Sequence, residues 1–267
     1  MGVGLMNVKE RNYCELYNGF HFKESVPDDC IAISFNWGEP FEEGIAVGTK
    51  SDGSILFAEY GTNGVLMVNS NEQIYANEDC GEMFRALTSL RNVYCDNFDT
   101  SHVYSMDAMF NTDLSLEYVD LRKWDVSKVK RFTHMFARCE KLKSVSVSDW
   151  DTSSAQFIFS MFNSCKELEV LDVSKWDTSN VLGMQRMFYH CNSLENLNIS
   201  KWNTSSCYSF ERMFEGCKKL KRLGIEDWDV SHADEFKKMF YNCPELMVDT
   251  TKWNINSNIA NTDNMMG

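Results

Sequence analysis

The sequence of 267 residues has little of what breaks or disorders a chain, with only three prolines and fourteen glycines. This scarcity argues against a disordered or collagen-like protein. It also lacks an apolar run long enough to cross a bilayer as a helix, so we expect no membrane insertion. Basic residues are outnumbered, with 26 Lys and Arg against 39 Asp and Glu and a formal net charge of −13. Phosphate backbones repel such a chain, so we expect no direct nucleic-acid partner.

Signals for export, metal binding and catalysis are missing as well. The first twenty residues lack the apolar core of a secretion signal, which predicts a cytoplasmic protein; the cell surface is the alternative if a leader was removed. The ten cysteines include no CxxC pair, and the five histidines make no HxxxH or HExxH spacing. Phosphate-binding loops and the GxSxG nucleophile motif do not occur. We therefore expect no enzyme, no cofactor and no metal site.

What the sequence does contain is a repeat of 26 residues. The dipeptide Met-Phe begins at positions 83, 109, 135, 161, 187, 213 and 239. Two further series keep the same step, and they are Trp124, Trp150, Trp176, Trp202 and Trp228, and Cys139, Cys165, Cys191, Cys217 and Cys243. A fixed period of this length indicates stacked structural repeats. We divide the chain into a small acidic β-rich unit or cap (1–73), seven repeats (74–256) and a polar tail (257–267).

One repeat illustrates the predicted fold. Residues 168–173 alternate and carry β-branched side chains, which predicts a short strand. Val181, Met184, Met187 and Phe188 then recur at helical spacing. We predict an α/β, leucine-rich-repeat-like solenoid with a parallel sheet on one side and short helices on the other. In the small β-rich N-terminal unit the expected strands are Ile31–Trp37, Ile45–Lys50, Ser54–Tyr60 and Gly64–Asn69.

The amino-acid sequence of the repeat resembles that of a known family. The stretch LEVLDVSKWDTSNVLGMQRMFYHCNSL, and the corner triplets Asp-Thr-Ser or Asp-Val-Ser at 99, 125, 151 and 177, are similar to the repeat of BspA-like bacterial surface proteins and mycoplasma-type lipoproteins. The similarity covers about residues 74–256. It implies a leucine-rich-repeat fold and a non-catalytic recognition scaffold, often adhesive and on a cell surface.

The outward positions of the predicted strands form the first candidate site. Inward positions repeat strictly, whereas these vary in size and charge, as expected where a repeat protein binds a large partner. Tyr and Arg are enriched among the residues that dominate binding energy. The partner-binding candidates are Tyr94, Tyr118, Asp120, Lys143, Asp172, Asn198 and Arg222. An ordinary solvated sheet face is the alternative.

Acidic residues near the N-terminus form the second candidate. Residues 1–78 hold four Lys and Arg against twelve Asp and Glu. This excess predicts a solubilising surface; the other hypothesis is an acidic face that meets a basic protein surface. The candidates are Asp28, Asp29, Glu39, Glu42 and Glu43.

Two periodic series have a structural and a functional interpretation. The corner Asp residues could bind Ca²⁺, but Asn replaces Asp at Asn203, which favours a local turn bond to the backbone. Cysteines on adjacent coils would lie close enough for disulfides, yet they fall on an apolar face, which favours reduced thiols in the core.

We interpret the protein as a non-catalytic protein-binding repeat scaffold. One hypothesis is an intracellular binder or inhibitor of a host or bacterial protein, for example a phage-encoded protein that blocks a nucleic-acid-binding enzyme. The alternative is a cell-surface adhesin or receptor-like module of the BspA-like type. The missing export signal favours the first hypothesis, and the family resemblance favours the second.

Overall fold

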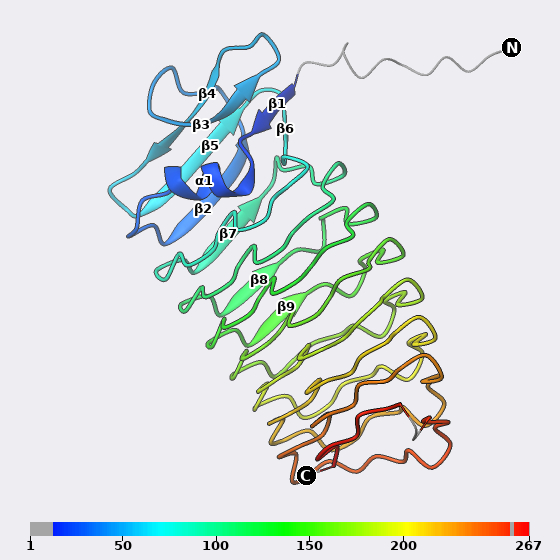
Figure 1. Cartoon of the computed structure of the whole chain (residues 1–267). Coiled ribbons are helices and arrows are strands. Elements are labelled where there is room, and N and C mark those ends of the chain that lie inside the picture. Colours follow the sequence, from blue (N-terminus) through cyan, green and yellow to red (C-terminus); the bar gives the residue numbers. More distant parts are fainter. Residues whose placement is uncertain (1–12, 257–258, 267) are drawn as a thin grey trace, which may run out of the picture.

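The computed structural model describes residues 13–256 and 259–266. The first twelve residues, where a leader was sought, and positions 257, 258 and 267 of the predicted tail lie outside the described residues. A curled sheet with one helix forms the N-terminal end, and a stack of coils follows it (Figure 1). The elements are β1 (Tyr13–Leu16), α1 (Gly19–Ser25), β2 (Ala32–Trp37), β3 (Ile45–Lys50), β4 (Ile55–Tyr60), β5 (Val65–Ser70), β6 (Gln73–Tyr75), β7 (Asn92–Cys95), β8 (Tyr118–Asp120) and β9 (Ser144–Ser146).

The N-terminal unit is built on a mixed sheet with the strand order β6-β1-β3-β4-β5-β2-β7. All four predicted strands are confirmed as β2, β3, β4 and β5, with their ends shifted by at most one residue. The sequence reasoning missed β1, β6 and the short helix α1. Asn18 caps α1 by accepting the His21 N–H at 3.1 Å, and the helix buries Phe22 completely.

The N-terminal unit and the first coil share one sheet. Strand β2 pairs in parallel with β7, and this pairing sets Ser34 opposite Tyr94. Helix α1 also contacts the first coil, because the Gly19 N–H donates to the Asp79 carbonyl at 3.0 Å. The Phe22 ring stands 6.1 Å from the Phe84 ring, so the helix also continues the aromatic core of the coils. The unit therefore covers the end of the stack.

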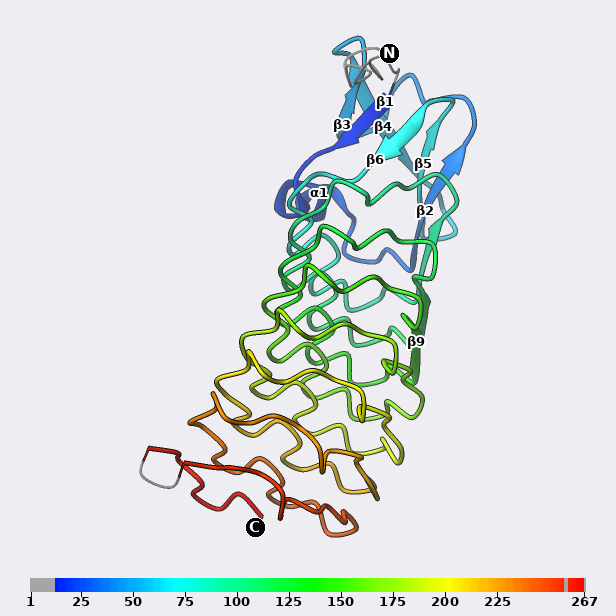
Figure 2. The same ribbon diagram turned by 90° about the vertical axis from the view of Figure 1, so that its right-hand side faces the viewer.

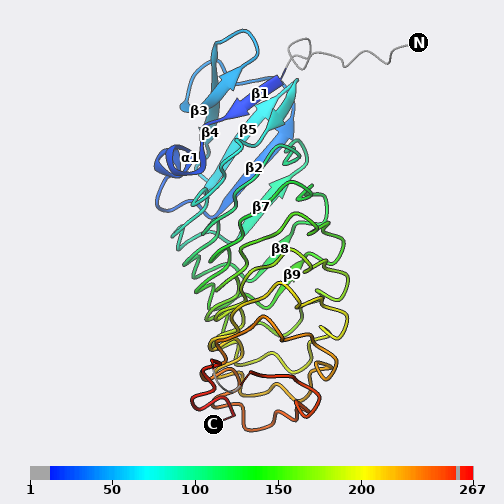
Figure 3. The ribbon, with the colours of Figure 1, turned by 45° about the vertical axis from the view of Figure 1, so that its right-hand side comes forward.

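Each 26-residue repeat forms one coil, and the coils lie one below another (Figures 2 and 3). Strand β8 pairs in parallel with β9, and single bridges continue this ladder to Val170 and from Asn196 to Arg222 and Met247. A second parallel ladder runs from Asp79 to Asn261 through one bridge per coil. We call the segment that follows this second ladder in each coil, with its Met-Phe dipeptide, the Met-Phe turn.

The predicted α/β, leucine-rich-repeat-like solenoid is wrong. The described residues hold one α-helix of seven residues, and it lies in the N-terminal unit; the protein is mostly β. The Met-Phe turns, where helices were expected, are successive tight turns instead. No helix in residues 13–256 or 259–266 is long and apolar enough to cross a membrane.

Backbone hydrogen bonding explains why these segments are not helices. The Met187 N–H donates to the Met184 carbonyl within the turn, at 3.2 Å, but the next N–H, of Phe188, donates to Met213 in the following coil, at 2.9 Å. Two residues in each such turn have left-handed backbones, here Arg186 with φ 54° and His190 with φ 55°. An α-helix needs every N–H to bond four residues back and every φ to be negative. In these segments alternate N–H groups bond the following coil, and the left-handed residues turn the chain so that they can do so. Neither requirement of an α-helix is met.

The core consists of ladders that cross the coils. Phe110, Phe136 and Phe162 stack almost parallel, with ring centroids 5.2 and 5.5 Å apart. In the last five members of the Trp series, counting Trp253, the indole N–H donates to a carbonyl oxygen of the preceding coil at 2.8–3.2 Å. The inward positions read from the repeat are therefore confirmed, although the backbone that carries them differs from the prediction.

Candidate binding surface

The paired segments of the N-terminal unit and of the coils have their outward sides on one side of the molecule, which we call the sheet face. It begins on β2 of the N-terminal unit, crosses β7 and β8, and runs down the coils (Figure 1). Its best-defined row stands at one register position of successive coils and consists of Tyr118, Ser144, Val170, Asn196, Arg222 and Met247. A ladder at each position fixes the backbone, so these side chains project from a rigid support.

Two tyrosines, on β7 and β8, are large exposed side chains of the sheet face in the first two coils. Tyr94 is 52% exposed and Tyr118 is 56% exposed. The Lys143 ammonium lies 5.7 Å from the Tyr118 ring centroid and bonds the Glu117 carboxylate at 2.8 Å. This lysine bond lowers the pKa of Glu117. Lys143 thus orients the Tyr118 ring, and less of its charge is available to a partner.

Three of the other candidates are engaged within the chain. Arg122 bonds both carboxylate oxygens of Asp120, at 2.6 and 2.9 Å, and lowers the pKa of that carboxyl. Asp172 and Asn198 each accept hydrogen bonds from the serine two residues later, so they shape the turn after the ladder.

The remaining candidate, Arg222, stands in the ladder between Asn196 and Met247. It is exposed and forms no ion pair with the rest of the described chain. Among the predicted candidates, Tyr94, Tyr118 and Arg222 therefore have the side chains most available to a partner.

The acidic candidates lie in two groups. Asp28 and Asp29 precede β2, whereas Glu39, Glu42 and Glu43 follow it in the loop before β3, and all five are exposed. A six-residue strand separates the groups by roughly 20 Å at about 3.3 Å per residue. They therefore do not form one compact patch.

The corner Asp series makes turns, as the sequence favoured. Asp125 Oδ1 accepts the Ser127 N–H at 2.9 Å, and Asp177 Oδ1 accepts the Ser179 N–H at 2.9 Å. Hydrogen bonds from the side chain and then from the backbone N–H of these serines lower the pKa of both carboxyls. Asn203 makes the same bond to Ser205 at 3.1 Å, which explains why an amide can replace the carboxylate. In the part of the chain that the structure describes, no group of three His, Cys, Asp or Glu side chains could hold a metal ion.

The cysteine ladder lies in the core with free thiols, as expected from its apolar face. Each thiol donates to a phenylalanine carbonyl 29 residues earlier; Cys165 bonds Phe136 at 3.1 Å and Cys191 bonds Phe162 at 3.1 Å. Burial raises the pKa of the Cys165 thiol well above its usual value and that of Cys243 to about 11. Such thiols pack as small hydrophobic groups and are poor nucleophiles.

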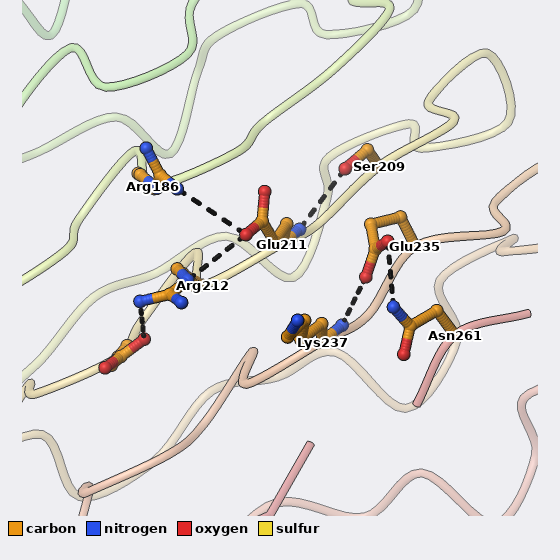
Figure 4. Close-up of polar contacts among 8 residues, drawn as sticks. Arg186, Ser209, Glu211, Arg212, Glu235, Lys237 and Asn261 are labelled. Atoms are coloured by element: carbon orange, nitrogen blue, oxygen red, sulfur yellow. Dashed lines mark hydrogen bonds and ion pairs between the residues drawn. The ribbon is translucent and has the colours of Figure 1, made fainter. Parts of the chain in front are cut away.

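A charged cluster on the Met-Phe turns was not predicted (Figure 4). Arg186 and Arg212 both bond Glu211 Oε1, at 3.5 and 3.1 Å. In the next coil Glu235 accepts the Lys237 N–H at 2.9 Å and Asn261 Nδ2 at 3.1 Å. Only the Arg186–Glu211 pair, 25 residues apart, joins an acid and a base at nearly one repeat length, so the repeat spacing could have indicated this contact alone. The Arg186–Glu211 ion pair and the Asn261–Glu235 hydrogen bond each join neighbouring coils, so the cluster stabilises the stack.

The family comparison accounts for most of the chain. The family model described as "Mycoplasma protein of unknown function, DUF285" matches residues 78–171 and 158–267. The chain belongs to this family. DUF285 covers the whole stack of coils and begins where the N-terminal unit ends, so the family pattern coincides with the repeat. The match fits the mycoplasma-type resemblance, whereas the BspA-like assignment stays a prediction. No curated protein matches the chain.

Proposed function

We propose that this DUF285 repeat protein is a non-catalytic scaffold that binds another protein on its sheet face. The observation that carries the proposal is the parallel pairing of β2 with β7, because it joins the N-terminal unit and the stack into one face. Half-exposed Tyr94 stands on β7, where the two parts pair, and half-exposed Tyr118 stands on β8 in the next coil. Rigid, exposed tyrosines supply large contact areas at low entropic cost and are common energetic centres of interfaces.

Two cellular settings remain as proposals for the same surface. The free, buried ladder thiols suit a reducing compartment, which supports an intracellular binder or inhibitor. The similarity of the repeat to BspA-like surface proteins supports the alternative, a cell-surface adhesin. Titration of thiols in protein isolated from its native source separates them: ten free thiols support the intracellular setting, and disulfides support the surface.

The test of the binding surface compares two double variants. Tyr94→Ala with Tyr118→Ala truncates the sheet face, whereas Tyr104→Ala with Tyr208→Ala truncates tyrosines that are 43% and 49% exposed outside it. All four side chains are exposed, so both variants should fold like wild type.

We expect partner capture and affinity to fall at least about 100-fold in the sheet-face variant and to stay near wild type in the control. Equal binding by wild type and the sheet-face variant, or loss only in the control variant, would overturn the proposal.

A further inference from the structure

Asp113 interrupts the cysteine ladder. In the five coils that follow, a cysteine fills this position and donates to a phenylalanine carbonyl at 2.9–3.1 Å. Asp113 is completely buried there. Its Oδ1 accepts the Leu87 N–H at 2.8 Å, and its Oδ2 is buried without a partner in the described structure. One carboxyl oxygen is therefore satisfied and the other is not.

Few charged or titratable groups face this carboxyl. Lys23 on α1 is the cation that acts on it, but no ion pair joins them, and Cys139 faces it from the next coil. The first coil contributes the apolar Leu87. An ionised carboxylate here would have one hydrogen bond and no contacting cation, an expensive arrangement inside a protein. Burial accordingly raises the pKa of Asp113 well above its usual value.

The ladder indicates where a proton on Asp113 would be used. Each ladder thiol donates to the phenylalanine carbonyl 29 residues earlier, and the corresponding carbonyl for Asp113 belongs to Phe84. A protonated carboxyl offers one donor and one acceptor, as a thiol does, whereas a carboxylate only accepts. The neutral form therefore fits the ladder and the ionised form does not.

We propose that Asp113 keeps its proton in the folded chain and makes the contact between the first two coils, beside α1, sensitive to pH. This contact becomes more stable as the pH falls. Because the folded state holds this proton more strongly than the unfolded chain, the contribution of Asp113 to stability is complete below the unfolded pKa of about 4 and declines as pH rises towards the folded pKa. Asp125 and Asp177, with lowered pKa values, have the opposite dependence and lose stability only in acid.

The experiment measures unfolding of wild type, Asp113→Asn and Asp113→Cys between pH 5 and 9, where the corner carboxylates stay ionised. We expect the unfolding equilibrium constant of wild type, relative to both variants, to rise by up to about tenfold per pH unit. Asp177→Asn serves as the exposed control and should follow wild type. Parallel pH profiles for wild type and the Asp113 variants would overturn the proposal.

An infrared measurement covers the case in which a variant fails to fold. At neutral pH, where the exposed carboxylates are ionised, the wild-type protein should still have one carboxylic-acid C=O band, that of Asp113. Acid titration adds the C=O bands of the other carboxyls but should not increase the contribution of Asp113. A spectrum with only carboxylate bands at neutral pH would refute a protonated Asp113 without any variant.

Discussion

Asn97 should be the most sensitive polar residue at the junction between the N-terminal unit and the stack. It is 1% exposed. Its Nδ2 donates to three carbonyl oxygens, those of Asn36 and Ser70 at 3.3 Å and Glu72 at 2.9 Å. Its Oδ1 accepts the Ile74 N–H at 3.2 Å. One amide therefore connects β2, the β5–β6 turn and β6 to the first coil.

The loss of stability expected for Asn97→Ala follows from the backbone groups that lose their hydrogen bond to the Asn97 amide. Asn97→Ala leaves several buried backbone groups without their hydrogen-bond partner, and each group left unsatisfied costs about 1–3 kcal/mol of stability. Allowing for relaxation, we expect a loss of about 3 kcal/mol. Asn97→Asp should cost more, because it directs a carboxylate oxygen at the same carbonyl groups.

Amide hydrogen exchange at Ile74 reports this junction directly. A loss of about 3 kcal/mol should speed exchange there by more than about 100-fold if the junction opens as a unit. Lys175 occupies the same repeat position three coils further along, on the exposed surface, and bonds Asp149 at 2.8 Å. Lys175→Ala should change stability by less than about 0.5 kcal/mol. Exchange at Ile74 that is unchanged in Asn97→Ala would refute the reasoning.

Two further predictions each compare a pair of substitutions within the repeats. Trp176→Phe removes the indole bond to the Val147 carbonyl, 3.0 Å long. It should cost about 1–2 kcal/mol in urea unfolding beyond Trp124→Phe, whose indole N–H makes no hydrogen bond within residues 13–256 and 259–266. Equal losses would contradict the role of the bond. Ala108 has a left-handed backbone with φ 54°, so Ala108→Gly should leave stability unchanged or raise it. Ala137 is buried and lies outside the left-handed region, so Ala137→Gly should lower stability by about 1 kcal/mol. The reverse order in thermal unfolding would contradict the turn geometry.

Most inward positions could be predicted because stacking repeats them. Phe136, Trp176 and Cys191 each belong to a series with a period of 26 residues. Such a period is required only of side chains that pack against the equivalent residue in the neighbouring coils. The four strands of the N-terminal unit could also be predicted, since alternating apolar residues and Gly-containing turns bound them. The short β6 and helix α1 offered much weaker signals.

The helices could not be rejected from the sequence. Val181, Met184, Met187 and Phe188 fit one face of a helix, but a series of four-residue turns buries the same residues. What decides between them is the N–H of Phe188, which bonds a coil 25 residues away. Left-handed φ values at Arg186 carry no composition signal either, because that position is not glycine.

The candidate surface was only partly accessible to sequence reasoning. The exposed row with Tyr118 follows from the repeat, but the pairing of Ser34 with Tyr94 does not, since β2 lies outside the repeat. Likewise, no pattern indicated that Asp120 would be held by Arg122. The extension of the sheet face into the N-terminal unit was therefore found only in the structure.

Site-specific photocrosslinking tests the central claim most directly. A photoreactive phenylalanine analogue replaces Tyr94 in one protein and Tyr208 in a second, and each protein is irradiated in extract from the native source. The proposed sheet-face interaction predicts a single dominant crosslinked protein from position 94, competed by unlabelled wild type, and none from position 208. A competed crosslink from position 208 with none from position 94 would contradict it.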